Sequence, residues 1–331
     1  MSRALRRNSA LRWQPSAALV TLRERSNLLA RIRGFFAAAG VLEVETPILS
    51  RSATTDPALA SLATAWQGPS GNSSLYLHTS PELPMKRLLA GGIGPIFQIC
   101  KVFRDGERGR LHHPEFTLLE WYRPGWGYRR LMDEVADLAR CALRDEHLPV
   151  EQLRYQDLFL EQLGVDPWDT DEAELKRTAV AQQIGGADAL ALSVDGWLDL
   201  LLTHCLEPGL GKDRLTFIYD YPPTQAALAR LRGGRVPVAE RFELYLGGVE
   251  LANGFQELTD PGEQRQRFTV DLGRRAAAGL ACPPIDEAFL AALEAGMPEG
   301  AGVALGIDRL MMQWLAAEHI DEVLAFPIEH A

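Results

Sequence analysis

The sequence contains few cysteines, no long apolar run and no excess of positive charge. Its four cysteines, among 331 residues, lie far apart and match no zinc-ligand spacing, which argues against a disulfide framework or a zinc centre. No apolar stretch reaches the roughly 18 residues that a membrane helix needs. The basic start, MSRALRRNSALRW, is followed by no apolar segment, so we expect no secretory signal. We therefore expect a cytoplasmic protein with reduced thiols and no membrane contact.

The charge balance and two missing motifs exclude further classes. The formal net charge is -10, from 44 acidic and 34 basic residues. This charge argues against a broad nucleic-acid surface, because phosphate neutralisation supplies much of that affinity, although a local basic patch stays compatible with it. The sequence has neither G-x-x-x-x-G-K-[ST] nor G-x-G-x-x-G. Any ATP is therefore bound without a P-loop or a Rossmann turn.

The stretch between residues 97 and 122 predicts two strands around a basic loop. After the loop, alternate residues share one face of the second strand: Phe116, Leu118, Glu120 and Tyr122. The loop itself carries Arg104, Arg108, Arg110, His112 and His113. Cations at the tip and a carboxylate on the strand suit a ligand with phosphates and an amine. A half-buried hairpin with a charged tip and no ligand remains the alternative.

A second candidate segment is LYLHTSPELPMKRLLAGG. It predicts a strand over residues 75–78 and a helix that begins at Ser80 and Pro81. Glu82 falls in the first helical turn, where a carboxylate complements the helix dipole. That structural role alone accounts for Glu82, and contact with a substrate amine is the functional alternative. The preceding residues 51–74 are rich in small and polar residues and predict an irregular loop.

Two glutamates follow a predicted hairpin turn at Gly247 and Gly248. Glu250 and Glu257 are seven positions apart, so a regular strand would place them on opposite faces. A bulge at residues 253–254 would bring the two carboxylates together. Carboxylates held close repel unless a cation lies between them, and magnesium bound with ATP phosphates is the usual cation.

The last candidate segment is GVALGIDRLMMQWL. It predicts a short strand over residues 302–305, a break at Gly306 and a helix from Ile307. A glycine at this turn lets a flat ring approach the backbone. Arg309, within the first helical turn, is placed to stack on adenine or to reach the terminal phosphates.

These segments resemble, in order, the motifs of the class II aminoacyl-tRNA synthetases, most closely those of the lysyl branch. The return strand carries H-x-P-E-F-T-x-x-E-x-Y, and the last segment resembles G-x-G-x-G-x-[DE]-R. An amphipathic helix starting near Ala17, which Ser16 can cap, feeds VLEVETPIL and resembles motif 1. The resemblance implies an α+β fold, with an antiparallel sheet that binds ATP and is flanked by helices. Motif 1 forms the dimer interface in this family, so a homodimer is implied.

The resemblance covers residues 17–331, which we expect to form one catalytic domain after a basic arm of residues 1–16. About 16 residues are too few for a folded anticodon-binding domain. The chain therefore resembles the truncated lysyl-synthetase paralogues that activate (R)-β-lysine with ATP and Mg²⁺ and attach it to a lysine side chain of elongation factor P. No tRNA partner is expected. The alternatives are an enzyme that transfers lysine to tRNA or another acceptor, and a non-catalytic regulatory paralogue.

The resemblance also implies a role for each matching residue. Arg104 and Arg309 are the implied catalytic residues, since they would hold the reacting phosphates. The implied ATP-binding residues are Arg104, Asp105, Gly106, Glu107, His113, Phe116, Glu250, Leu251, Gly306 and Arg309. The implied substrate-binding residues are Ser80, Pro81, Glu82, Glu120, Tyr122, Asn253 and Glu257. Glu250 and Glu257 are the implied magnesium ligands.

Three positions depart from the lysyl pattern. Gly106 stands where the family has a glutamate, so adenine recognition passes to Glu107 or to the backbone. His113 replaces an asparagine and predicts a pH-dependent contact near ATP. Ala304 replaces a glycine, and its methyl group is expected to reshape the pocket for a β-amino acid.

Overall fold

A computed structural model describes residues 13–331 except residue 70, so most of the predicted basic arm lies outside the described residues. Within them, nine strands form one sheet in the order β1-β5-β6-β12-β11-β10-β8-β7, with β9 paired to β10. The strands are β1 (Leu42–Glu43), β5 (Ile96–Phe103), β6 (Glu115–Pro124), β7 (Val150–Arg154), β8 (Leu215–Tyr221), β9 (Leu231–Arg232), β10 (Val238–Leu246), β11 (Val249–Gln256) and β12 (Gly300–Gly306). Only the outer pairs β1/β5 and β7/β8 are parallel. The expected α+β class with an antiparallel sheet is confirmed.

Three helices cover one face of this sheet: α1 (Leu19–Ala38), α3 (Tyr128–Leu143) and α9 (Ile307–Leu315). In β6, Leu119 and Trp121 point into this core, and both are fully buried. Residues Leu131, Val135 and Leu138 of α3 recur at helical spacing and meet them there. Full burial of such a side chain contributes roughly 1.5–3 kcal/mol. This core fixes the strands that carry the candidate site.

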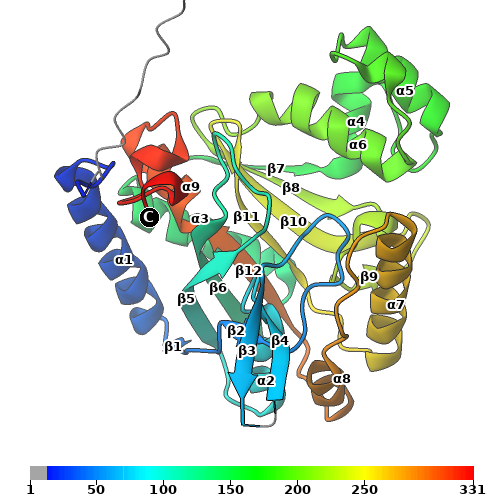
Figure 1. Ribbon diagram of the computed structural model, residues 1–331. Helices are drawn as coiled ribbons and strands as arrows, with labels where there is room; N and C mark the ends of the chain where they lie inside the picture. The colour runs from blue at the N-terminus through cyan, green and yellow to red at the C-terminus, as the bar shows by residue number, and fades with distance from the viewer. Residues whose placement is uncertain (1–12, 70) are drawn as a thin grey trace, which may run out of the picture.

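The other face carries β2 (Leu49–Ser50), β3 (Ala63–Gly68) and β4 (Gly71–Leu77), together with α2 (Glu82–Ala90), α7 (Pro261–Ala277) and α8 (Glu287–Glu294). Figure 1 shows α1 on one side of the sheet and α7 and α8 on the other. Met85 and Leu89 of α2 pack against Phe289 of α8, next to Tyr122 of β6. Residues of α2 are thereby held over the middle of the sheet.

A further helical group gathers beside β7 and β8 (Figure 1). It contains α4 (Tyr155–Leu163), α5 (Glu172–Ala181), α6 (Val194–Leu201) and a π-helical turn, η2 (Leu202–Leu206). Short 3-10 turns complete the fold: η1 (Ala187–Ala189), η3 (Glu207–Gly209), η4 (Pro223–Gln225), η5 (Ile320–Glu322) and η6 (Ile328–His330). Within the described part of the chain, no helix has the length and apolarity that a membrane crossing requires.

The structure confirms some predicted elements and corrects others. The hairpin of β5 and β6 is confirmed, and so is the turn at Gly247 and Gly248, whose φ angles of 60° and 72° suit a two-residue hairpin turn. The irregular loop predicted over residues 51–74 was wrong, since it contains β3 and most of β4. Most residues of β3 are exposed, so no apolar alternation marks that strand. The motif 1 strand is shorter than predicted, because only Leu42 and Glu43 pair with β5.

Candidate active site

A cavity of about 510 Å³ lies on the sheet face opposite α1 and α3. Strands β6, β11 and β12 form its floor, and the start of α2 and the segment 47–61 form its walls. It brings together six of the predicted substrate-binding residues: Ser80, Glu82, Glu120, Tyr122, Asn253 and Glu257. The seventh, Pro81, caps α2 instead of lining the cavity. Arg104 reaches the same cavity and is the predicted phosphate-binding residue within it.

Strand register explains how these side chains meet. Ala304 of β12 pairs with Glu120 of β6 on one side and with Asn253 of β11 on the other. Gly302 pairs with Tyr122 in the same way, two residues along the strand. A Cβ atom at Gly302 would collide with Glu257 Oε1 and with the Tyr122 ring. Glycine at residue 302 therefore makes room for the two side chains that converge there.

Glu120 is a buried carboxylate on the cavity floor, as enclosed as Glu257. Its side chain accepts hydrogen bonds from the Tyr122 hydroxyl at 2.5 Å and from the Ser80 hydroxyl at 2.7 Å. Burial raises the pKa of Glu120 to about 7, and the nearby charge of Glu82 adds to the rise. A buried carboxylate of this kind is stabilised by an ammonium group, so the cavity suits an amine ligand.

The structure does not bring Glu250 and Glu257 together. The irregularity in the pairing of β10 and β11 leaves Leu251 as the extra residue, whereas the predicted bulge was at residues 253–254. Glu257 Oε2 lies 2.5 Å from Lys86 Nζ, and Glu250 Oε2 lies 3.1 Å from an Arg309 nitrogen. Seven residues of strand span about 20 Å. Within the described residues, no group of three or more His, Cys, Asp or Glu side chains is placed to hold a metal ion.

The donor set therefore does not fit a magnesium ion shared by Glu250 and Glu257. Glu250 by itself does fit, because Mg²⁺ usually keeps several waters and takes one or two carboxylates together with nucleotide phosphates. Glu250 lies beside Arg309, the residue predicted to hold those phosphates. Glu257 is already neutralised by Lys86.

Arg309 is held at the start of α9 by several acceptors. Its nitrogens lie 3.0 Å from the Glu250 carbonyl and 2.9 Å from His112 Nε2. Asp308, the preceding residue, bonds to the Thr117 backbone N–H and to Arg25 of α1, each at 2.6 Å. These contacts tie α9 to β6 and to α1, and so fix where Arg309 projects.

The other predicted ATP residues fall into two groups. Arg104 lies 5.0 Å from the Phe116 ring centroid and 3.5 Å from Glu107, so these three come together. Asp105 and Gly106 form the exposed turn that follows Arg104, and φ of +77° explains the glycine at residue 106. In the second group, Leu251 and Gly306, only main-chain atoms are available to bind ATP. The Leu251 side chain faces the helix-side core, and a Cβ at Gly306, which has φ of -76°, would meet the Arg309 side chain at 3.8 Å.

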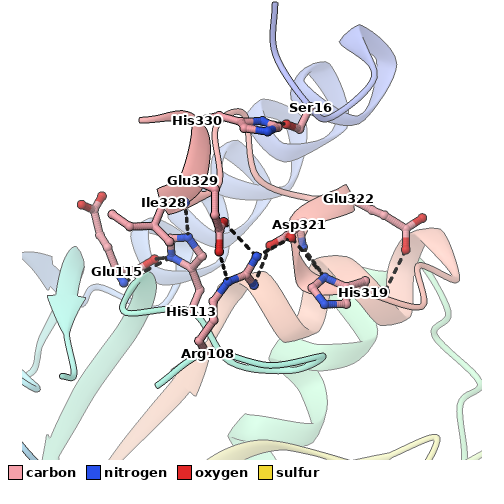
Figure 2. A network of polar contacts seen from close by, with 10 residues as sticks. All are labelled: Ser16, Arg108, His113, Glu115, His319, Asp321, Glu322, Ile328, Glu329 and His330. Carbon is pink, nitrogen blue, oxygen red and sulfur yellow. Dashed lines mark hydrogen bonds and ion pairs between the residues drawn. The ribbon is translucent and has the colours of Figure 1, made fainter. Parts of the chain in front are cut away.

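The His113 ring does not line the cavity, and its contact with ATP stays a prediction. Figure 2 shows its ring between two main-chain groups, with Nδ1 donating to the Glu115 carbonyl at 2.6 Å and Nε2 accepting from the Ile328 N–H at 2.9 Å. It is 4% exposed and anchors the C-terminal segment. The neighbouring His112 contacts Arg309 instead, and partial burial together with the Arg309 charge lowers the pKa of His112.

The same C-terminal segment ties down the basic loop (Figure 2). Arg108 donates to Asp321 at 2.7 Å and to Glu329 at 2.8 Å, and its hydrogen bonds lower the pKa of Glu329 to about 2. Ser16, predicted to cap α1, contacts His330 at 2.8 Å instead, and Ala18 is the N-cap residue. The C-terminal segment thus braces the loop that carries Arg104, and Ser16 in turn contacts that segment.

His113→Ala is expected to lower the free energy of unfolding by about 1–3 kcal/mol, because two buried main-chain groups lose their partner. The KM for ATP should change little. His112→Ala is the matched control, and it should raise the KM for ATP with little effect on thermal unfolding. Thermal melts and ATP titrations of both variants test this. A large KM effect of His113→Ala without a loss of stability would restore its predicted role at ATP.

Two residues near the site, Lys86 and Gly302, were not predicted from the sequence. Lys86 lies four residues after Glu82, a spacing that places the two on one side of α2, and this signal was available. Gly302 carried no signal of its own, because its role depends on Tyr122 and Glu257 meeting above it.

Comparison with known proteins identifies the family of the chain. A family model described as "tRNA synthetases class II (D, K and N)" matches residues 2–330. The chain is 49% identical to the "Elongation factor P--(R)-beta-lysine ligase" of Pectobacterium atrosepticum and 50% identical to the proteins of that name from Edwardsiella ictaluri and Klebsiella pneumoniae. Each match covers 96% of this chain and 98% of the relative. The chain therefore belongs to the class II tRNA synthetases of the D, K and N group, and within it to the family of the elongation factor P--(R)-beta-lysine ligases.

Proposed function

We propose that this protein activates (R)-β-lysine with ATP and transfers it to a lysine side chain of elongation factor P. The observation that carries the proposal is the amine-binding cavity. It places the carboxylates of Glu82, Glu120 and Glu257 within one space that Arg104 also reaches. A diamino acid needs anionic partners for its two ammonium groups and a cation where its carboxylate meets the phosphate. Family membership at about 50% identity supports the same substrates.

In the first step, a substrate carboxylate oxygen attacks the α-phosphorus of ATP and pyrophosphate leaves, which gives an aminoacyl adenylate. We propose that Arg104 holds the α-phosphate and the carboxylate, and that Arg309 holds the terminal phosphates. Both act by fixing two anions against each other and by stabilising the charge that develops. Bound beside Glu250, Mg²⁺ would neutralise phosphate charge. We propose that adenine binds next to Arg104, beside Phe116 and Glu107, because both of these residues contact Arg104.

In the second step, the amine of the acceptor lysine attacks the adenylate carbonyl and AMP leaves, so an amide bond forms. The substrate ammonium groups stay bound meanwhile, and we propose Glu82 for the one nearer the carboxylate and Glu120 with Tyr122 for the distal one. Asn253, on the cavity floor beside Ala304, is placed to orient the substrate. These contacts hold the carbonyl in place for the incoming amine.

We further propose a homodimer, a cytoplasmic location and no tRNA partner. Exposed apolar side chains on α1, β1 and β2 support the dimer, since Leu19, Val20, Leu42 and Leu49 are each 47–65% exposed. ATP and a translation factor as substrates support the location. The net charge of -10 argues against a tRNA-binding surface. We keep residues 1–16 as the proposed arm before a catalytic domain of residues 17–331.

ATP–pyrophosphate exchange with (R)-β-lysine and α-lysine side by side tests the proposal. We expect strong exchange with (R)-β-lysine, little with α-lysine, and subsequent transfer to elongation factor P. Exchange with α-lysine alone, followed by charging of tRNA, would establish the tRNA-type alternative. The absence of exchange with either amino acid would establish the non-catalytic paralogue.

Ala304→Gly is expected to raise kcat/KM for α-lysine relative to (R)-β-lysine by about tenfold or more, as for one methyl group in a fitted pocket. The reason is the position of Ala304 between Glu120 and Asn253 on the cavity floor. Ala301→Gly is the matched control, since it removes the same methyl group from β12 on the helix side. An unchanged preference in Ala304→Gly would contradict the expectation.

A further inference from the structure

A buried lysine lies directly behind the amine cavity. Lys86 of α2 has a side chain with no exposed surface, and its Nζ lies 2.6 Å from Glu82 Oε1 and 2.5 Å from Glu257 Oε2. Its ammonium group also faces the rings of Phe255 and Phe289, at 5.1 Å and 5.9 Å from their centroids. Lys86 does not line the cavity, although both of its carboxylate partners do. It therefore acts on a ligand only through them.

Lys86 is a permanent cation despite its burial. Burial disfavours the ammonium form, but the adjacent carboxylates of Glu257 and Glu82 outweigh it and raise the pKa of Lys86 above its ordinary value. A buried charge without a partner costs several kcal/mol, so the ion pairs are required on both sides.

The net charge of the cavity comes from three carboxylates and one ammonium group. When an ammonium ligand is bound and all three carboxylates are ionised, Glu82, Glu120 and Glu257 contribute three negative charges and Lys86 contributes one positive charge, which leaves -2. We propose that Lys86 is a positioning residue that sets this charge at -2 and so matches the cavity to an amino acid with two ammonium groups. The inference rests on the proposed function, because it concerns the substrate of that same site.

Geometry supports the same assignment. Lys86 occupies Glu257 Oε2, whereas Glu257 Oε1 lies buried over Gly302 at the cavity floor. Glu257 is 2% exposed, and among the described residues its Oε1 has no hydrogen-bond donor. A buried carboxylate oxygen of this kind needs a donor, and a substrate ammonium group supplies one. Lys86 holds Glu257 so that this oxygen stays turned toward the ligand.

Calorimetric binding of α-lysine and (R)-β-lysine to the full chain tests the inference. Lys86→Met leaves Glu82 and Glu257 facing each other with no cation between them, so they repel and turn away from the ligand. We expect the Kd for whichever diamino acid binds the wild type to rise at least tenfold. Glu257→Gln leaves a charge of -1 and should also weaken binding. The double variant Lys86→Met/Glu257→Gln restores -2 and should bind at least fivefold more tightly than either single variant.

The KM and kcat of pyrophosphate exchange give the second readout. The charge role predicts a higher KM for the amino acid, an unchanged KM for ATP and a nearly unchanged kcat in Lys86→Met. Lys212→Met, which removes an exposed lysine, is the matched control and should change nothing. If Lys86→Met does not fold, the comparison of Glu257→Gln with the double variant decides the question.

Three results would overturn the inference: an unchanged Kd in a folded Lys86→Met variant, a double variant that binds no better than Glu257→Gln, or no binding of either diamino acid to the wild type. A wild type that binds a diamino acid but shows no pyrophosphate exchange would overturn the proposed function alone. The two failures are therefore distinguishable.

Discussion

Arg309→Ala is expected to lower kcat/KM for ATP in pyrophosphate exchange by about 10²–10³-fold, the usual effect of removing one preorganised donor from a developing charge. The wild-type guanidinium is held by the Glu250 carboxylate at 3.1 Å and by His112 at 2.9 Å, so its position is fixed before ATP arrives. The loss should fall on ATP and leave the Kd for the diamino acid unchanged, because Arg309 does not line the amine cavity.

Arg309→Lys separates charge from geometry. A lysine keeps the positive charge but lacks the planar fork of donors, so we expect an activity between those of the alanine variant and the wild type. Arg265→Ala is the control, since it removes an exposed arginine that bonds to Glu287. Unaltered exchange kinetics in a folded Arg309→Ala variant would remove Arg309 from the proposed ATP site.

Local pattern predicted the framework of the site well. The alternation after the basic loop placed Glu120 and Tyr122 on one face of β6, and both line the cavity as that face requires. The glycine pair 247–248 marked the turn between β10 and β11, because only a left-handed backbone closes it readily. Both features depend on a few neighbouring residues, so they can be predicted from the local sequence.

Long-range pairing decided the features that local pattern could not predict. The irregularity in β11 falls at Leu251, where its register with β10 shifts, and the length of chain between Glu250 and Glu257 leaves them with different partners, Arg309 and Lys86. The two adjacent histidines likewise have different partners. His113 accepts a hydrogen bond from the Ile328 N–H of the C-terminal segment, whereas His112 contacts Arg309. Nothing near residue 113 in the sequence indicates that contact.

The other large expected effect is on binding of the diamino acid in the amine cavity, through Glu120. Glu120→Gln should raise the Kd for the diamino acid by about 10²–10³-fold, since removing one partner of a buried charge pair typically costs 3–5 kcal/mol. The amide keeps the size of the side chain and one acceptor oxygen, so one of the Tyr122 and Ser80 hydroxyls retains its acceptor and the other can accept from the new NH2 group. The difference therefore measures charge. Glu146→Gln, at an exposed residue, is the matched control.

A pH titration of binding tests the same residue independently. Because the pKa of Glu120 is about 7, its carboxyl is mostly neutral at pH 6 and mostly ionised at pH 8. The ammonium ligand binds the ionised form, so wild-type affinity should rise with pH through this window and weaken roughly tenfold per pH unit below the pKa. Glu120→Gln should flatten this dependence, because no proton remains to be lost at residue 120 and only Glu257, whose pKa burial raises to about 8, still titrates beside the amine. A wild-type Kd that stays constant between pH 6 and pH 8, or a Glu120→Gln variant that keeps the slope, would assign the titration and the amine contact to another group.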